Sequence, residues 1–330
     1  MKIIVEPANL WEDFKHAWIE GMAHTHWFKQ PKIFDYNLEE ELKDLKDDFK
    51  ESNNLFLVAK VDKDDKLLGA LCIKIMNNIA LIRGWQPTVP PEKKEIGVAE
   101  SLINYGLKSL KSRGVLKVNF RMKFPYNQPK TQIWPLELYR KFGFKQEIPI
   151  AIQLLADLRR EKIYTNNYGD AVLETCDGYN LEEFVEFTLR AYASTQEDKA
   201  IHGWDSLVSN PEEILKCHQA IRNNKLGEFY GDCCKLFLVD SKVAGYILSV
   251  IRKSKYVPPF GLIANLGVFP EYRRGGIGYI LLIKTHETFR NYGCLYAYVG
   301  TPETNGGAIK LYTKAGYKPV FKLITLFKKL

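Results

Sequence analysis

The chain has 330 residues, of which 46% are hydrophobic and 26% charged, and its formal net charge at pH 7 is +8. This composition is typical of a soluble globular protein long enough for two ordinary domains. No apolar run reaches the roughly 18 residues of a membrane span, and no basic run with interleaved aromatic residues resembles a nucleic-acid motif. We therefore expect neither a membrane nor a nucleic acid as a partner.

Hydrophobic periodicity predicts a regular series of elements in the first half of the chain. The series is a strand at 2–6, helices at about 10–22 and 38–50, strands at 55–61, 66–75 and 79–84, a helix at about 98–112, a strand at 115–122, a short helix at 136–142 and a strand at 148–155. A strand at the start argues against a signal peptide. His24 and His26 have metal-like spacing but no partner cluster, so we expect no metal site there.

The second half repeats this order. It predicts a strand at 171–174, helices at 181–192 and 211–223, strands at 235–240, 243–251 and 261–268, a helix at 276–292, a strand at 295–299, a helix at 305–314 and a closing strand at 320–327. The same succession of elements occurs twice, which indicates an internal repeat with a long period.

The register of short blocks supports the repeat. The block 91–99 aligns with 270–278, and Gly114, which follows the helix, lies 179 residues before Gly293. The block 138–144 aligns with 311–317 at a slightly smaller offset, as loop insertions would produce. We therefore predict two duplicated domains, 1–156 and 169–330, joined by a linker at 157–168.

The cysteine pattern shows no obvious pairing. The chain has six cysteines: Cys72, Cys176, Cys217, Cys233, Cys234 and Cys294. No two of them form a C-x-x-C pair, and the adjacent pair does not have metal-ligand spacing. We expect reduced, packed thiols and therefore a cytoplasmic protein.

The stretch 266–278, LGVFPEYRRGGIG, carries the clearest chemical signal. A buried-strand pattern leads through a turn to two arginines and three glycines, and an amphipathic helix follows. Free N–H groups at a helix start and the helix dipole favour an anion, and glycine lets the backbone approach it closely. The loop has neither the Gly-Lys-Ser/Thr ending of a Walker A loop nor the glycine spacing of the Rossmann fingerprint.

The pattern Arg273-x-x-Gly276-x-Gly278 resembles the pyrophosphate loop of the GNAT superfamily of acyl-CoA-dependent N-acyltransferases. A second block resembles the N-x-x-A-x-x-L-Y-x-K-x-G-[FY] helix and turn of that family; it consists of Asn305, Ala308, Ile309, Leu311, Tyr312, Lys314, Gly316 and Tyr317. The resemblance implies an α/β fold with a mixed sheet. It would comprise two GNAT-like domains in tandem, each a mostly antiparallel sheet with splayed central strands flanked by helices.

The resemblance also implies the donor site. Acetyl-CoA would be the co-substrate, with no metal, and Tyr312 would be the general acid that protonates the departing thiolate. The cofactor-binding residues would be Leu266, Gly267, Val268, Arg273, Arg274, Gly275, Gly276, Ile277, Gly278 and Asn305. Asn305 fits an N-cap equally well, and both roles can hold together.

The first domain departs from the family pattern. Lys94 replaces the first arginine, Glu95 reverses the second charge and Ile96 replaces a glycine. The asparagine-led block is missing, and Pro129 and Pro135 are expected to interrupt the helix there. We therefore expect a degenerate domain that is structural or shapes the acceptor site, with Tyr139 as a packing residue.

The acceptor side gives weaker signals. The family often carries a carboxylate on the strand at 261–268, but this strand holds Asn265, which cannot titrate. The loop 193–207 offers Glu197, Asp198, His202 and Asp205 as candidate bases, and a water chain or the terminal carboxylate are the alternatives. The candidate substrate residues are Tyr192, Glu197, His202, Trp204 and Asp205.

The leading hypothesis is an N-acetyltransferase that acts on a primary amine of a small molecule, such as an amino sugar or an aminoglycoside. A non-catalytic acyl-CoA sensor or scaffold is a second reading. A Fem-like transferase that uses aminoacyl-tRNA is a third, and the intact pyrophosphate loop argues against it.

Overall fold

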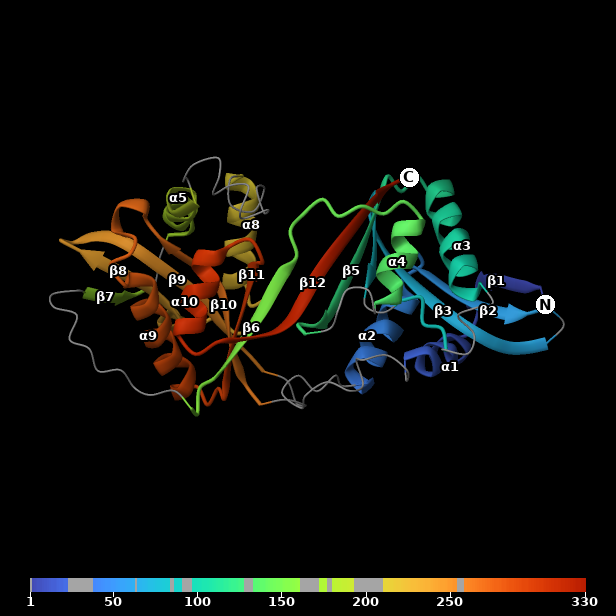
Figure 1. The fold of residues 1–330 in the computed structure, drawn as a ribbon, viewed down its shortest axis with the longest axis horizontal. Helices are drawn as coiled ribbons and strands as arrows, with labels where there is room; N and C mark the ends of the chain where they lie inside the picture. The colour runs from blue at the N-terminus through green and yellow to red at the C-terminus, as the bar shows by residue number, and fades with distance from the viewer. Residues whose placement is uncertain are drawn as a thin grey trace. The chain divides into compact units, whose positions relative to one another are not determined.

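The chain folds into two compact units. The structure, a computed structural model, describes residues 2–22, 38–62, 64–83, 86–90, 97–127, 133–160, 172–176, 180–192, 210–253 and 258–330. The first unit is Met1–Glu147 with Leu323–Leu330, and the second is Ile148–Lys322 (Figure 1).

The first unit is a mostly antiparallel sheet with helices. Its strands, in sheet order, are β1 (Ile3–Pro7), β2 (Leu55–Val61), β3 (Asp64–Met76), β4 (Ile79–Arg83) and β5 (Lys117–Pro125). Only β4 and β5 pair in parallel. The helices are α1 (Trp11–Met22), α2 (Leu38–Lys50), α3 (Val98–Ser112) and α4 (Trp134–Lys141). The end of β12 (Lys318–Lys329) belongs to this unit, where Phe327 pairs with Lys145.

The second unit has the same design. Its strands, in sheet order, are β7 (Val172–Thr175), β8 (Cys234–Val239), β9 (Lys242–Arg252), β10 (Phe260–Val268), β11 (Tyr296–Pro302) and β6 (Ala151–Asp157). Only β10 and β11 are parallel. The helices are α5 (Leu181–Tyr192), α8 (Pro211–Arg222), α9 (Ile277–Asn291) and α10 (Gly306–Lys314), with 3-10 turns at Gly231–Cys233 and Pro270–Tyr272.

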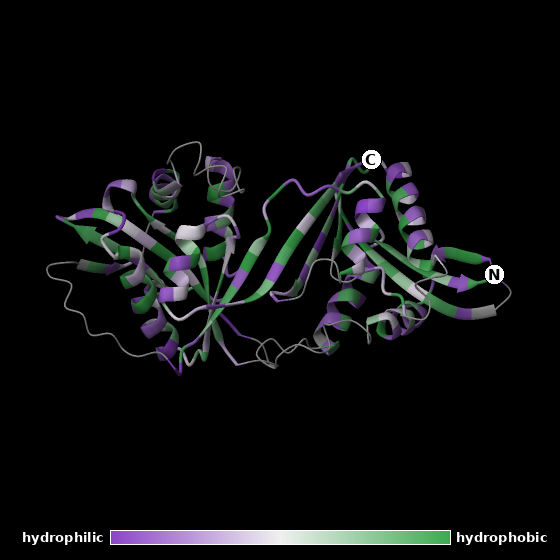
Figure 2. Ribbon diagram, in the orientation of Figure 1, coloured by the Kyte–Doolittle hydropathy of each residue, from purple (hydrophilic) through white to green (hydrophobic). Residues whose placement is uncertain are grey.

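The helices form where one face is apolar. In α3 the buried residues are Val98, Ala99, Leu102, Ile103, Gly106 and Leu110. Their spacing of three and four residues puts them on one stripe, and Figure 2 shows this helix banded with hydrophilic and hydrophobic residues. The strands between the helices carry the rest of the core. The periodicity that predicted the elements is therefore the periodicity of burial.

The backbone geometry supports the duplication. Helices α3 and α9 each have 15 residues and each begin after a left-handed glycine, Gly97 with φ 73° and Gly276 with φ 83°. Each is followed by another left-handed glycine, Gly114 with φ 74° and Gly293 with φ 75°. A side chain at such positions would strain the backbone, so glycine is required there. Both pairs lie 179 residues apart, as the sequence register predicted.

The fold class is confirmed, and two strands correct the predicted division of the chain. Strand β6, expected to close the first domain, pairs with β11 in the second unit. The end of β12, expected in the second domain, lies in the first unit. Hydrophobic alternation predicts a strand but not its neighbour, so the exchange was not visible in the sequence. The linker 157–168 stays a prediction, because 161–168 lie outside the described residues.

One smaller correction concerns proline. Pro135 was expected to interrupt a helix, but it lies in the first turn of α4. A proline is tolerated there because the N–H groups of the first turn have no partner within the helix. Pro129 lies outside the described residues.

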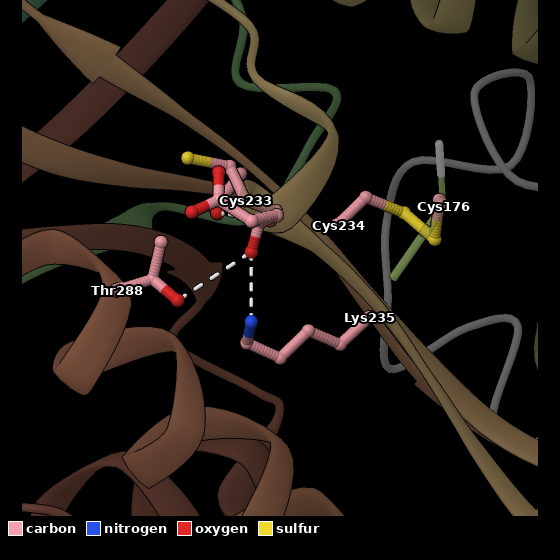
Figure 3. Close-up of a disulfide and its surroundings, with 7 residues drawn as sticks. Cys176, Cys233, Cys234, Lys235 and Thr288 are labelled. Atoms are coloured by element: carbon pink, nitrogen blue, oxygen red, sulfur yellow. Dashed lines mark hydrogen bonds between the residues drawn. A yellow bond between two sulfur atoms is a disulfide. The ribbon is translucent and has the colours of Figure 1, made fainter. Parts of the chain in front are cut away.

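A disulfide overturns the expectation of six reduced cysteines. Thr175 of β7 pairs with Lys235 of β8, so the next residues, Cys176 and Cys234, lie opposite each other. Their Cα atoms are 5.2 Å apart and the sulfurs are bonded (Figure 3). The two residues are 58 positions apart in the chain, which hid their proximity. Cys72, Cys217, Cys233 and Cys294 are free thiols, and in Figure 3 the Cys233 side chain points away from the disulfide.

The disulfide removes one argument for a cytoplasmic location, which stays a prediction. None of the helices within the described ranges combines the length and the apolar character that a membrane crossing requires.

Reduction of the disulfide should destabilise the second unit. Closing a loop of this length restricts the unfolded chain, so the bond should contribute about 2–4 kcal/mol to the free energy of unfolding. Urea unfolding with and without a reductant measures the difference, with Cys217→Ser as the control that should keep the wild-type response. Equal midpoints, or six reactive thiols in the denatured unreduced protein, would contradict the bond.

Candidate functional site

The central strands of the second unit separate part-way along their length. The parallel pairing of β10 and β11 runs from Phe260 opposite Tyr296 to Ile263 opposite Val299 and then ends. Beyond that point β10 continues to Val268 paired only with β9, and β11 continues to Pro302 paired only with β6. A bulge in β10 lies at this point, between Ile263 and Asn265. The strands therefore leave a gap beside residues 264–268.

Two residues of β10 direct their backbone groups into this gap. Phe269, the first residue after β10, donates its N–H to the carbonyl of Ala244 in β9, at 2.9 Å. Because alternate residues of an antiparallel strand face the same neighbour, Gly267 faces β9, and Leu266 and Val268 face the gap. This register is the one that the predicted backbone role of Leu266 and Val268 requires. Gly267 is needed for packing, because a Cβ atom there would lie 2.4 Å from the ring of Tyr246.

The anion loop begins directly after β10. Gly276 is the N-cap of α9, and Arg274 also has a positive φ, 66°. Among the described residues, none accepts a hydrogen bond from the backbone N–H groups of residues 274–278. Five consecutive donors at the start of a 15-residue helix form a site suited to a phosphate group.

The two arginines of the loop have different surroundings. Arg273 donates to the carbonyl of Ala191 at 2.6 Å and to that of Val268 at 3.2 Å. It thus joins the end of α5, where a cation is favoured, to the end of β10. Arg274 is exposed and bonds to no other described residue. The geometry therefore assigns Arg273 to fixing the loop, and leaves the charge of Arg274 available to a ligand.

The second sequence block packs against the first. A Cβ atom on Gly278 would lie 3.0 Å from Leu311, so this glycine lets α10 approach the start of α9. Lys314 Nζ lies 4.9 Å from the ring centre of Tyr279. Asn305 Oδ1 accepts from the N–H of Ala308 at 3.0 Å, which confirms the N-cap role. Its predicted contact with a cofactor stays a prediction.

Tyr312 lies on α10 with only 6% of its surface exposed. Burial, with a smaller contribution from Tyr192, raises the pKa of its hydroxyl above the ordinary value of 10. Tyr312 therefore stays protonated at any physiological pH. Its ring packs at 5.6 Å from the ring of Tyr317, and no described residue forms a hydrogen bond with its hydroxyl.

Tyr192, at the end of α5, is the one predicted substrate residue that the structure describes. Its hydroxyl lies 3.0 Å from Asn265 Oδ1 and 3.1 Å from the carbonyl of Leu266. Burial raises the pKa of Tyr192 to about 12, and the charge of Arg273 opposes the shift. The other predicted substrate residues lie outside the described residues: Glu197, His202, Trp204 and Asp205.

A buried polar network behind Tyr192 was missed in the sequence. Thr188 Oγ1 lies 2.9 Å from Tyr246 Oη, 3.4 Å from His218 Nε2 and 3.5 Å from Asn265 Nδ2. The available signal was a polar residue inside an apolar stripe. Thr188 falls among the buried positions of α5, and His218 among those of α8.

The first unit lacks this arrangement where it can be compared. All of β4 pairs with β5 over the described strand. Tyr139, the counterpart of Tyr312, is fully buried, stacks on Phe120 at 3.9 Å, and has a hydroxyl without a partner. Lys94, Glu95 and Ile96 lie outside the described residues. Within the described ranges, no group of three or more metal-ligating side chains occurs.

The splayed strands, the anion loop and the α10 block match one known family. Residues 199–317 match the model of the acetyltransferase (GNAT) family. This match lies within the second unit, Ile148–Lys322. None of the curated proteins matches the chain, but solved GNAT structures share its fold over the full length.

Three solved structures illustrate the similarity. A GCN5-related N-acetyltransferase from Sphaerobacter thermophilus is 16% identical with a TM-score of 0.64, over 99% of this chain and 95% of that chain. A tandem GNAT protein from the clavulanic acid biosynthesis pathway is 12% identical with a TM-score of 0.55, over 99% and 98%. The glucosamine N-acetyltransferase region of a fungal β-N-acetylglucosaminidase is 13% identical with a TM-score of 0.63, over 99% of this chain and 38% of that one.

The buried His218 should make stability depend on pH. Burial lowers its pKa from 6.5 to about 4. Between these values the unfolded chain binds a proton that the folded protein does not, so stability falls as the pH falls. The slope should reach about 1.4 kcal/mol per pH unit, and His218→Gln should remove it.

Urea unfolding at pH 7, 6 and 5 measures this slope. His16→Gln is the control, because His16 lies on α1 with a side chain that is 65% exposed. Parallel pH profiles for the wild type and His218→Gln would contradict the buried neutral state.

Proposed function

We propose that the second unit is an N-acetyltransferase that transfers an acetyl group from acetyl-CoA to a primary amine of a small molecule. The observation that supports this most is the relative position of the gap, the anion loop and Tyr312. The gap beside Leu266 and Val268 lies at the end of β10, the strand that leads directly into the anion loop. Helix α10, which carries Tyr312, packs on the start of α9. A donor with a phosphate at one end and a thioester at the other fits such a path.

The described residues would bind the donor in two places. The N–H groups of residues 274–278 would bind the pyrophosphate, with Arg274 adding positive charge. The gap-facing N–H groups of Leu266 and Val268 would donate to the pantetheine arm. One of these N–H groups would also polarise the thioester carbonyl, where negative charge develops as the amine attacks.

The reaction requires two proton movements. The nitrogen of the neutral amine forms a bond to the carbonyl carbon, and the carbon–sulfur bond breaks. Tyr312 would give its proton to the departing thiolate, and the proton lost by nitrogen would return through water to the phenolate. A thiol has a pKa of about 8.5, so donation from a phenol of raised pKa is uphill in water. The fixed position of the hydroxyl on α10 must supply the advantage.

Two arguments support a small molecule as the acceptor: the similar solved structures, and the lack of features that would suit tRNA. One structure of similar fold is a glucosamine N-acetyltransferase region and another comes from the clavulanic acid biosynthesis pathway. The described residues contain no basic run that would suit tRNA. Asn265, where a titratable base would be expected, favours a second candidate, an acyl-CoA sensor without turnover.

Thiol release from acetyl-CoA with a panel of primary amines tests the proposal. Turnover should appear with at least one amine, and Tyr312→Phe should lower kcat about 100-fold, while calorimetry gives an unchanged Kd for CoA. Tyr139→Phe is the matched control in the first unit and should keep wild-type turnover. Binding of CoA without turnover would favour the sensor. A wild-type kcat in Tyr312→Phe would remove the phenol from the mechanism.

A further inference from the structure

Thr188 is the centre of the buried network. It lies on α5 about one helical turn before Tyr192, the candidate acceptor residue. It is 1% exposed, and its hydroxyl donates to the carbonyl of Phe184 at 2.8 Å. Because a hydroxyl has one proton and two lone pairs, the oxygen of Thr188 can then accept at most two further hydrogen bonds. Its other polar neighbours are the hydroxyl of Tyr246, Nε2 of His218 and Nδ2 of Asn265, at 2.9, 3.4 and 3.5 Å.

This acceptor fixes the orientation of the Asn265 amide. The NH2 group of Asn265 must face Thr188, which places Oδ1 toward the hydroxyl of Tyr192 at 3.0 Å. His218 Nε2 lies 3.4 Å from Thr188 Oγ1, and its Nδ1 atom is buried without a partner among the described residues. Because burial lowers the pKa of His218 to about 4, the network is uncharged at neutral pH.

The direction of the Asn265 amide decides where the Tyr192 proton goes. With Oδ1 facing it, Tyr192 donates to Asn265. The Tyr192 oxygen and the carbonyl of Leu266, 3.1 Å away, then both act as acceptors. If Asn265 were turned over, its NH2 group would donate to Tyr192, and Tyr192 would donate to the Leu266 carbonyl instead. The Leu266 carbonyl would then accept from Tyr192 and the Tyr192 oxygen from Asn265, so each oxygen would keep one lone pair fewer for an incoming amine.

We propose that Thr188 is a positioning residue that makes the Tyr192 hydroxyl oxygen and the Leu266 carbonyl a two-acceptor subsite for the attacking amine. This inference rests on the proposed function and deepens it. A neutral primary amine has two N–H groups and one lone pair. The two oxygens accept both N–H groups and leave the lone pair for the thioester carbonyl. The subsite therefore selects primary amines over their N-methyl counterparts, which have one N–H group fewer.

Two variants of Thr188 distinguish the role of its hydroxyl from the role of its branched side-chain shape. Thr188→Val keeps the branched shape and removes the hydroxyl, and Thr188→Ser keeps the hydroxyl and removes the methyl group. With the amine identified by the panel, Thr188→Val should raise the KM for the amine at least tenfold and lose the preference over the N-methyl analogue. The Kd for CoA and the KM for acetyl-CoA should stay within twofold. Thr188→Ser should behave as the wild type.

The opposite order, with Val active and Ser impaired, would show a packing role and overturn the proposal. Tyr192→Phe provides an independent test if Thr188→Val does not fold. It removes one hydroxyl from a half-buried ring, so the protein should still fold. It should show the same rise in the KM for the amine. An unchanged KM in Tyr192→Phe would also overturn the subsite. Absence of turnover in the wild type with every amine would instead overturn the proposed function, and the subsite with it.

Discussion

The site depends on the point where the pairing of two parallel strands stops. After Ile263 and Val299, β10 and β11 no longer bond to each other, so one side of the β10 backbone has no strand partner there. Unpaired backbone groups are costly when buried, so a sheet opens in this way only where another partner can bond to them. A bulge between Ile263 and Asn265 marks this point, and β10 then leads to α9, whose own first N–H groups donate to no residue that the structure describes. Strand and helix thus present two sets of donors along one path.

The surroundings of this gap are held by uncharged groups and by the guanidinium group of Arg273. Arg273 connects the last turn of α5 to the end of β10, which fixes the start of the anion loop without using the exposed Arg274. Behind Tyr192, a threonine, an asparagine, a tyrosine and a histidine form a network that includes no carboxylate among the described residues. An uncharged network avoids the desolvation cost of a buried ion and still holds Asn265 between Thr188 and Tyr192. The orientations of the side chains in this site are therefore fixed by hydrogen bonds more than by ion pairs.

Much of the fold could be predicted from the sequence, because burial and turn chemistry leave local patterns. The bounds of α3 and α5 match the predicted ranges 98–112 and 181–192, and the left-handed glycines fall where the repeat places them. The exchange of β6 and β12 and the bond between Cys176 and Cys234 could not be predicted, because each depends on which strands become neighbours. For the site, the resemblance pointed to the loop, Tyr312 and the gap-facing residues of β10, whose roles stay predictions. The roles of Thr188 and His218 depend on contacts between α5, α8 and β10, and a polar residue in an apolar stripe gives no sign of its partner.

The central claim is that one donor molecule lies against both the start of α9 and the gap side of β10. Amide NMR spectra of the full-length protein, recorded during a titration with CoA, test this most directly. The account predicts concerted shifts of the amides of residues 274–278 together with those of Leu266 and Val268, and no comparable shift at Val98 and Ala99 at the start of α3. Shifts confined to α3, or saturation of CoA binding without change at Leu266 and Val268, would contradict it.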